Sequence, residues 1–183
     1  MPNRIDVGIL GATGVVGQTF VALLDRHPWF KVAWLGASER SSGKRYDSAT
    51  RWRLPSNLTE TVASMTIDQC VPANAPQLVF SGLDSSVAGD IESKFAHAGC
   101  TVVSNAKNFR MADDVPLLVP EINPDHLGLF STQSDFRKWP GRIVTNPNCS
   151  TIILALALAP LRGFGLTAAT VSTLQAVSGA GYP

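Results

Sequence analysis

The chain has 183 residues, of which 45% are hydrophobic and 16% charged, enough for one globular domain and the beginning of a second. Its formal net charge of +1 gives no basis for electrostatic binding to nucleic acid or to a membrane surface. The longest apolar run, residues 152–161, is too short to span a bilayer, and the N-terminus lacks the pattern of a secretory signal. Three widely spaced cysteines argue against a disulfide scaffold or a metal site and predict a reducing, cytoplasmic compartment.

The first predicted elements form a strand–helix–strand unit. Residues 4–10 read as a short apolar strand, followed by a glycine-rich turn at 11–17 and a helix that ends near Pro28. Residues 31–36 read as a second apolar strand. This βαβ order is typical of parallel sheets and predicts an α/β fold.

The same alternation continues through the middle of the chain. Residues 38–55 are rich in Ser, Arg and Gly and are expected to form a loop. Further elements are predicted as strands at 78–81, 100–104 and 142–145, a helix at 87–98 capped by Asp84 or Ser85, and an extended or looped segment at 116–124.

The last part of the chain is expected to begin a second unit. Residues 150–161 read as a helix that is apolar on all faces and should therefore be buried, and residues 170–176 read as a strand. We therefore expect a Rossmann-like, doubly wound, mostly parallel sheet in residues 1–148. Residues 149–183 would start a second, α+β domain that is cut short, as in a fragment or a truncated product.

The glycine-rich turn follows a strand and opens a helix, which is the setting of a dinucleotide-binding turn. Its glycines, Gly11, Gly14 and Gly17, are spaced as GxxGxxG rather than GxGxxG. In such a turn the backbone approaches a pyrophosphate, and the helix N-terminus offers it free N–H groups. The alternative is a turn whose glycines only let the helix pack against the strand.

The segment after the second strand favours NADP over NAD. Ser38, Arg40 and Ser41 could hold a ribose 2′-phosphate through charge-assisted hydrogen bonds. Glu39 argues the other way, because an acidic residue could bind a ribose hydroxyl. A solvated basic loop is the alternative without a ligand.

Cys149 is the candidate nucleophile. It lies between a strand and a helix, where the helix dipole favours the thiolate and the first-turn N–H groups could hold an oxyanion. Asn148 and Ser150 could line that pocket. Cys70 and Cys100 fit the commoner role of a small core residue. None of the three histidines is near Cys149 in sequence, so the general base would lie beyond residue 183.

Taken together, these motifs resemble the aspartate-semialdehyde dehydrogenase family, within the wider group that includes glyceraldehyde-3-phosphate dehydrogenase. The segments that carry the resemblance, in family order, are 11–17, 104–110, 146–150 and 175–181. The resemblance implies NADPH-dependent reduction of aspartyl phosphate to aspartate semialdehyde, with release of phosphate, through a cysteine thioester. That reaction supplies the aspartate-derived amino acids, including threonine and methionine.

The resemblance also implies a role for individual residues. Cys149 would be the nucleophile and Gln175 would position the bound intermediate, while Asn105 and Arg110 would hold the phosphate beside Asn148. The residues implied for the cofactor are Thr13, Gly14, Val15 and Val16 at the pyrophosphate, Leu83, Ser85 and Ser86 at the adenine side, and Ser178 and Gly179 further along the chain.

The chain departs from the family pattern in length, because members are about twice as long and have two domains. The resemblance places the catalytic histidine and the arginine for the substrate carboxylate in the second domain, so we expect these 183 residues alone to be inactive. It implies a homodimer or tetramer for the full-length form. The alternatives are an acyl-CoA reductase acting on malonyl-CoA, and a truncated nucleotide-binding module without catalysis.

Overall fold

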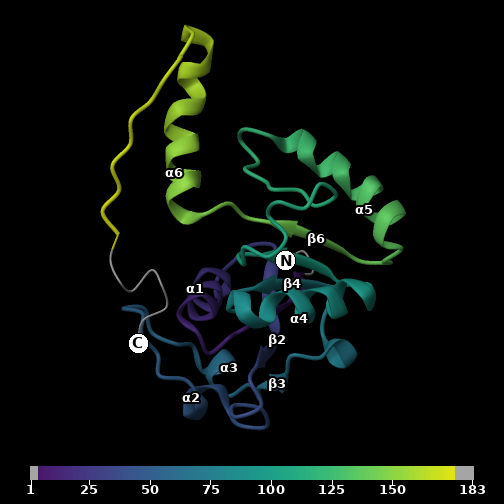
Figure 1. Ribbon diagram of the computed structural model, residues 1–183. Coiled ribbons are helices and arrows are strands. Elements are labelled where there is room, and N and C mark those ends of the chain that lie inside the picture. The colour runs from purple at the N-terminus through teal and green to yellow at the C-terminus, as the bar shows by residue number, and fades with distance from the viewer. Residues whose placement is uncertain (1–3, 176–183) are drawn as a thin grey trace.

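The computed structural model describes residues 4–175 and is built around one six-stranded sheet (Figure 1). All neighbouring strands are parallel, and their order is β3-β2-β1-β4-β5-β6. The strands are β1 (Ile5–Leu10), β2 (Phe30–Ala37), β3 (Asp68–Gln69), β4 (Leu78–Ser81), β5 (Thr101–Ser104) and β6 (Arg142–Thr145). The chain thus builds the sheet outward from β1 in both directions, which confirms the predicted doubly wound, Rossmann-like architecture.

Helices connect the strands over both faces of the sheet. They are α1 (Val15–Leu24), α2 (Tyr46–Ala49), α3 (Glu60–Ala63), α4 (Ser85–His97), α5 (Leu129–Arg137) and α6 (Cys149–Leu158), with 3-10 helices η1 (Pro72–Asn74), η2 (Pro124–Gly128) and η3 (Ala159–Phe164). Within residues 4–175, no helix is both long enough and apolar enough to cross a membrane.

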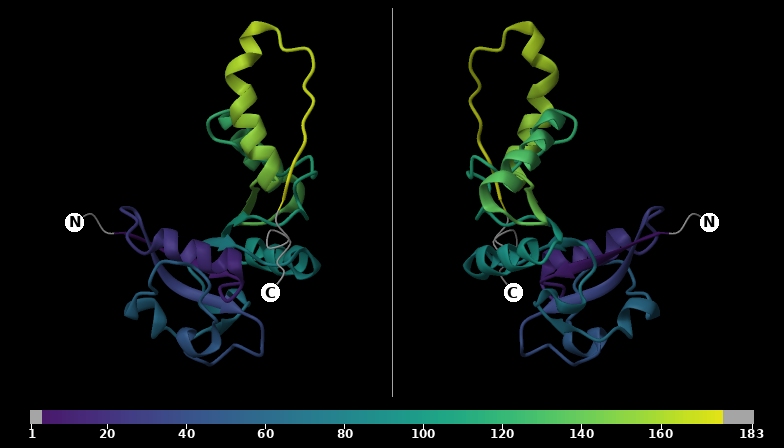
Figure 2. Two further views of the ribbon diagram at one scale, coloured as in Figure 1. Left: turned by 90° about the vertical axis from the view of Figure 1, so that its left-hand side faces the viewer. Right: turned by 90° about the vertical axis from the view of Figure 1, so that its right-hand side faces the viewer.

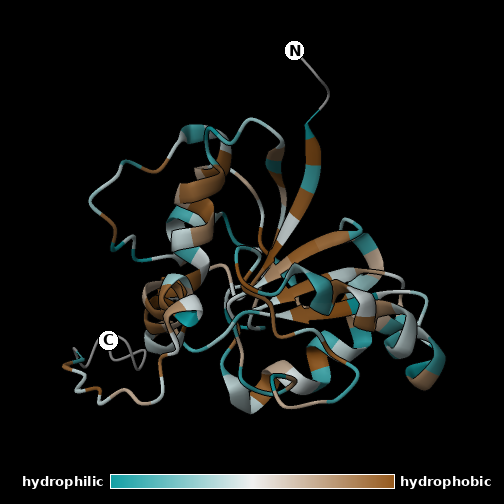
Figure 3. Cartoon of the chain, turned by 90° about the horizontal axis from the view of Figure 1, so that it is seen from above, coloured by the Kyte–Doolittle hydropathy of each residue, from teal (hydrophilic) through white to brown (hydrophobic). Residues whose placement is uncertain are grey.

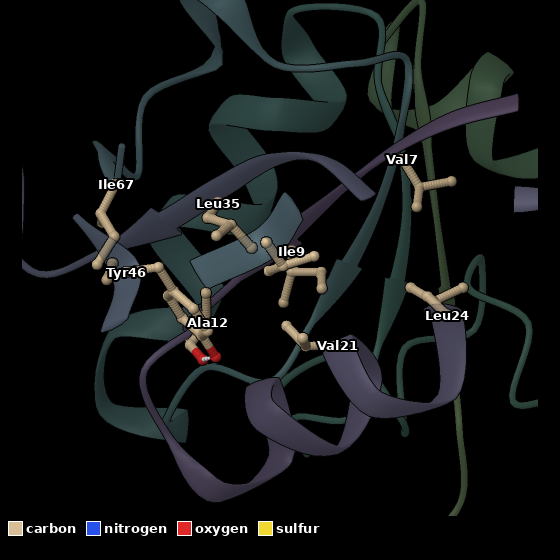
Figure 4. Close-up of a cluster of buried hydrophobic side chains, with 10 residues drawn as sticks. Val7, Ile9, Ala12, Val21, Leu24, Leu35, Tyr46 and Ile67 are labelled. Atoms are coloured by element: carbon tan, nitrogen blue, oxygen red, sulfur yellow. Dashed lines mark hydrogen bonds between the residues drawn. The ribbon is translucent and has the colours of Figure 1, made fainter. Parts of the chain in front are cut away.

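Two hydrophobic clusters, one on each face, hold the helices to the sheet. Figure 4 shows the cluster under α1, where Val21 lies next to Ile9 of β1 and Leu24 lies nearest to Val7 of the same strand. The cluster on the opposite face packs Phe95 and Ala96 of α4 against Val79, Val102, Leu10 and Trp34, which come from the strands. Neighbouring residues such as Ile9 and Leu10 belong to different clusters, because successive side chains of a strand point to opposite faces.

Several short elements lie where the sequence pattern gave no signal. The segment expected to be a loop after β2 contains α2, and the connection to β4 adds α3, β3 and η1. Tyr46 explains why α2 forms there: its ring is fully buried, and its hydroxyl donates a 2.8 Å hydrogen bond to the carbonyl of Ala12 (Figure 4). Such a long-range contact leaves no periodic trace in the sequence.

The prediction that the helix after β6 is buried was wrong. None of the residues of α6 is buried, and Ile153 is 70% exposed. In Figures 1 and 2, α6 rises away from the sheet layers, and Figure 3, which looks down on α6, shows it as predominantly apolar. The reason is physical: an apolar helix is buried only where another element covers it, and within residues 4–175 no element does.

The strand expected at residues 170–176 is also not found. Residues 170–175 are exposed and have no regular structure, and residue 176 lies outside the described residues. A strand needs a neighbour to accept and donate its main-chain hydrogen bonds. This segment instead returns from the far end of α6 without a strand beside it (Figure 1).

Candidate functional site

The parallel arrangement brings four loops to one edge of the sheet. The carboxyl ends of all strands meet there, and at the β1–β4 boundary the chain leaves the sheet toward opposite faces. Ligands of open α/β sheets bind at such a switch point. The loops that meet there begin at Gly11 after β1, Gly82 after β4, Asn105 after β5 and Asn146 after β6.

Two glycines of the turn after β1 are required by its geometry. Gly11 has φ +75°, and its N–H donates a 2.9 Å hydrogen bond to the carbonyl of Gly36 on β2. A Cβ on Gly17 would lie 2.2 Å from the carbonyl oxygen of Gly11, so only glycine fits there. Gly17 therefore does let the helix pack against the strand, as the alternative interpretation of the turn had it. The same close packing brings the start of α1 near the end of β1.

The start of α1 is suited to bind an anion. Gly14 occupies the N-cap position, and α1 has no side-chain cap. The N–H groups of Val15, Val16 and Gly17 come first in the helix and have no partner within it, as in any first helical turn. Val15 and Val16 are also exposed. Together, the close backbone and the free N–H groups fit a pyrophosphate.

Gln18 fixes this turn, a role that the sequence did not reveal. Its side chain is 1% exposed, and its Nε2 donates to the carbonyls of Thr13 and Arg51 at 3.0 and 3.1 Å. Its Oε1 accepts a 2.8 Å hydrogen bond from the N–H of Arg53. One buried amide thus holds Thr13 in place. The only available signal was a glutamine on the buried face of a helix.

A cavity of about 360 Å³ lies beside the turn, between the ends of β2 and β3 and the start of α4. Its volume is in the range of small-molecule sites. Its lining residues are Ala37, Ser38, Glu39, Gln69, Cys70, Val71, Leu83, Val87 and Ile91. Of the residues predicted for the cofactor, Ser38 and Leu83 line the cavity, and Arg40 and Ser41 do not. Glu39, whose acidic side chain argues for NAD rather than NADP, also lines the cavity.

One of the two serines at the start of α4 takes part in the N-cap of that helix. Asp84 is the N-cap, as one of the two predicted alternatives had it, and its Oδ1 accepts a 2.8 Å hydrogen bond from the N–H of Ser86. Hydrogen bonds from Ser86 hold the pKa of the Asp84 carboxyl below its usual value. The main-chain carbonyl of Ser85 accepts a hydrogen bond from Asn108. The Ser86 N–H is therefore already used within the protein.

Arg110 joins the loops after β5 and β6. Its Nε donates to the carbonyl of Asn146 at 2.9 Å and its Nη2 to the carbonyl of Asn105 at 2.7 Å. The Asn146 side chain donates a 2.6 Å hydrogen bond to Oδ1 of Asn105. A guanidinium has five N–H groups, so three of them donate to no acceptor within residues 4–175. This half-buried cation can therefore still bind an anion.

Cys149 is the first residue of α6, three positions after Asn146. Asn148 caps that helix, because its Oδ1 accepts hydrogen bonds from the N–H groups of Ser150 at 3.0 Å and Thr151 at 3.2 Å. This confirms the predicted strand-to-helix junction. Gln175, far along the chain, lies beside the same turn, with its Nε2 donating to Oγ of Ser150.

The three cysteines differ in exposure. Cys149 is exposed, Cys70 is half-buried and Cys100 is buried. Burial raises the pKa of both the Cys70 and Cys100 thiols. Among the three, Cys149 is thus the thiol that combines solvent access with a position at a helix N-terminus.

Within residues 4–175, no histidine is hydrogen-bonded to Cys149 or to Arg110. His27 follows α1 and stacks on Phe30 at the beginning of β2, and His97 ends α4 near Trp139, so both lie toward the amino ends of the strands. His126 is in η2, and its Nδ1 is buried without a hydrogen-bond partner within residues 4–175. Two other predicted cofactor residues, Ser178 and Gly179, lie outside the described residues.

Comparisons with known proteins agree with this geometry. Aspartate-semialdehyde dehydrogenase of Archaeoglobus fulgidus is 49% identical over 98% of this chain, which covers 53% of that protein. The corresponding enzyme of Saccharomyces cerevisiae is 46% identical over 100% of this chain, which covers 52% of that enzyme. The chain therefore spans about half the length of these curated relatives.

Solved structures and a family model give the same result. The crystal structure of aspartate semialdehyde dehydrogenase with NADP from Candida albicans matches with a TM-score of 0.81 and 44% identity, over 90% of this chain and 48% of that one. Residues 6–129 match the family described as semialdehyde dehydrogenase, NAD binding domain. The chain belongs to the semialdehyde dehydrogenase family, and most of its length corresponds to that family's NAD-binding domain.

Proposed function

We propose that this chain carries the cofactor site and the nucleophile of an NADPH-dependent aspartate-semialdehyde dehydrogenase. The observation that carries this proposal is the exposed Cys149 at the start of α6. Arg110 is hydrogen-bonded to Asn146, which lies three residues before Cys149 in the chain. Nucleophile and phosphate-binding cation then share the edge of the sheet where the glycine turn also lies. The relatives from Archaeoglobus fulgidus and Saccharomyces cerevisiae, both named aspartate-semialdehyde dehydrogenase, support the aspartate-derived substrate.

The chemistry begins with attack by the Cys149 thiolate on the acyl carbon of aspartyl phosphate. A C–S bond forms, the C–O bond to phosphate breaks, and inorganic phosphate leaves. NADPH, when bound, supplies the hydride that reduces the thioester carbonyl carbon. The C–S bond then breaks as the carbonyl re-forms, so the aldehyde leaves and Cys149 returns as the thiolate, while the one proton that the overall reaction consumes goes to the departing phosphate.

The residues around Cys149 would assist this reaction in distinct ways. The unused N–H groups of Arg110 would hold the departing phosphate beside Asn105 and Asn148. The N–H of Cys149 itself would stabilise the oxyanion that forms during attack, because the next N–H groups of α6 already donate to Asn148. Gln175, which contacts Ser150, would orient the acyl group.

We propose NADP as the cofactor, in agreement with the NADP named for the Candida albicans structure. The N–H groups of Val15, Val16 and Gly17 would bind the pyrophosphate. The adenosine would enter the cavity lined by Ser38 and Leu83. Arg40, exposed two residues after Ser38, would then reach the 2′-phosphate from outside the cavity.

We also propose that residues 1–183 alone do not turn over, because no histidine is hydrogen-bonded to Cys149 within residues 4–175 and the family resemblance places the catalytic histidine in a second domain. Cytoplasmic conditions suit the free thiol, since oxidation would block Cys149. Two alternatives keep the same geometry: an acyl-CoA reductase, and a module that binds a nucleotide without catalysis.

The test follows the acylation of Cys149, which does not need turnover. The chain is incubated with aspartyl phosphate, with malonyl-CoA or with buffer, then digested and mapped by mass spectrometry. We expect an aspartyl adduct on the Cys149 peptide and one equivalent of released phosphate. Iodoacetamide should label Cys149 faster than Cys70 or Cys100, whose pKa values are raised by burial.

The Cys149→Ser variant is the matched control. It should lose the adduct but bind NADP with a Kd within about twofold of the parent, because the cofactor contacts lie on other loops. A malonyl adduct in place of the aspartyl adduct would favour the acyl-CoA reductase. NADP binding without any adduct would favour the non-catalytic module, and preferential labelling of Cys70 or Cys100 would exclude Cys149 as the nucleophile.

A further inference from the structure

A carboxylic acid is buried beneath the loops of the proposed site and has no part in the proposed reaction. Glu92 on α4 is 0% exposed, and its Oε1 accepts a 2.7 Å hydrogen bond from Oγ of Ser104, which is also fully buried. The same Ser104 oxygen accepts a 3.0 Å hydrogen bond from the N–H of Ala106. Glu92 thus holds the turn that contains Asn105.

A second serine completes this cluster. Ser81 is fully buried, and it pairs with Ser104 in the register of β4 and β5. Ser81 Oγ and Glu92 Oε2 are both buried and make no hydrogen bond within the described residues, to each other or to any other group. Burial raises the pKa of Glu92 more than the two hydroxyls lower it.

The cluster lies directly under the loop that holds Arg110. Ser104 is the residue before Asn105, and the N–H of Asn105 donates a 3.0 Å hydrogen bond to the carbonyl of Ser81. Asn105 in turn accepts from Arg110 through its carbonyl and from Asn146 through its side chain. A shift of the turn after Ser104 would therefore move both partners of Asn105.

We propose that Glu92 is a positioning residue, which fixes the turn after β5 through Ser104 and thereby sets the Asn105–Arg110–Asn146 arrangement that receives phosphate. The proposal rests on the proposed function, because bound phosphate is what reports on the arrangement. A purely structural acid would act differently: its loss would lower stability without a selective effect at the phosphate site.

The experiment measures how well inorganic phosphate protects Cys149 of the 183-residue chain from iodoacetamide. Glu92→Leu removes both hydrogen-bonding oxygens, Ser104→Ala removes the hydroxyl that joins Glu92 to the turn, and Glu92→Gln keeps an acceptor and a donor. We expect the phosphate concentration for half-protection to rise about fivefold or more in Glu92→Leu and Ser104→Ala, and to stay within about twofold in Glu92→Gln.

Phe95→Leu is the matched control, because Phe95 is fully buried three residues further along α4, and its side chain has no hydrogen-bonding group with which to hold the turn after β5. It should lower stability but leave phosphate protection and NADP binding unchanged. If Glu92→Leu fails to fold, Ser104→Ala decides the matter alone.

The outcomes separate this inference from the function on which it rests. Absence of phosphate protection in the parent chain would contradict the proposed phosphate site, and the inference would fall with it. Protection in the parent that is equally strong in Glu92→Leu and Ser104→Ala would overturn the role of Glu92 alone. A loss in Glu92→Gln as large as in Glu92→Leu would also overturn it, since the neutral amide preserves the hydrogen bonds.

Discussion

Two buried glutamine side chains in this protein hold separate main-chain segments together through hydrogen bonds. Gln133 on α5 is fully buried, and its Nε2 donates to the carbonyls of Asp114 and Ile143 while its Oε1 accepts from the N–H of Ile143. Gln18 serves the glycine turn in the same manner. A glutamine suits this role because one side chain offers both a donor and an acceptor to segments that cannot pair as a sheet.

Arg40 gives a prediction at the scale of a single residue. It is exposed two residues after the cavity-lining Ser38, so we expect it to contact the 2′-phosphate that distinguishes NADP from NAD. Arg40→Ala should reduce the preference for NADP by about tenfold or more, since a hydrogen bond to a charged group contributes about 1.5–3 kcal/mol. Titrations of both dinucleotides against the 183-residue chain measure this directly.

Arg26→Ala is the control for that measurement, because Arg26 is exposed after α1, away from the cavity. It removes the same charge without the proposed contact and should leave the preference unchanged. An Arg40→Ala variant that discriminates between the dinucleotides as well as the parent would contradict the assignment, and Glu39 would then be the residue to examine.

At the scale of elements, α4 illustrates which part of the molecule the sequence reveals. Its N-cap follows a local pattern, and Asp84 was one of the two predicted alternatives. The role of Glu92 was not predicted, because an acid on an amphipathic helix normally faces water. Gln18 and Gln133 escaped prediction because most of their hydrogen-bond partners lie 10 to 35 residues away in the chain.

The site shows the same division between local and distant signals. Cys149, Asn148 and the glycine turn could be predicted because a strand end followed by a helix start is a local feature. The contact between Arg110 and Asn146 spans 36 residues, and only the resemblance to a known family indicated a role for Arg110. The burial of α6 was predicted wrongly. An apolar sequence indicates that a helix is stabilised by packing against another element, but it does not identify that element.

Glu92 also gives a prediction on pH and stability. Its pKa in the folded protein is raised above 4.5 by burial, so the folded state binds more protons than the unfolded state over the range between the two values. Stability from this group is therefore present below pH 4.5 and is lost as the pH rises through the folded pKa. Glu92→Gln, which cannot ionise, should escape this loss.

Urea unfolding of the parent and Glu92→Gln at several pH values tests the sign. We expect similar unfolding free energies near pH 4 and an advantage of about 1 kcal/mol or more for the glutamine variant near pH 8. The other carboxyl groups cancel in the difference between the two proteins. A difference that is independent of pH would show that Glu92 titrates alike in the folded and unfolded states.

For the whole molecule, the contrast between the covered sheet and the uncovered α6 is the dominant feature. Both faces of the sheet carry buried clusters, whereas α6 and η3 stand clear of them (Figure 2). We propose that residues 149–183 belong to a separate structural unit, consistent with the predicted boundary after residue 148. The break falls between β6, which ends at Thr145, and α6, so that Cys149 would lie where the two units meet.

The exposed surface of α6 and η3 leads to a prediction on self-association. Ile153, Leu156, Leu161 and Phe164 are 70%, 40%, 45% and 86% exposed, and apolar surface of this extent favours contact with another copy. We expect the 183-residue chain to associate at high concentration, and Ile153→Glu to weaken the association about tenfold or more, because burying an isoleucine contributes about 1.5–3 kcal/mol. Sedimentation velocity over a concentration series measures the effect.

Leu23→Glu is the matched control, since Leu23 on α1 is 69% exposed, almost the same fraction as Ile153, but lies on a helix that already covers the sheet. It introduces the same charge into the same chain and should leave the association constant unchanged. Equal weakening by both substitutions would point to a general effect of charge, and association that is insensitive to Ile153→Glu would show that α6 is not the contact surface.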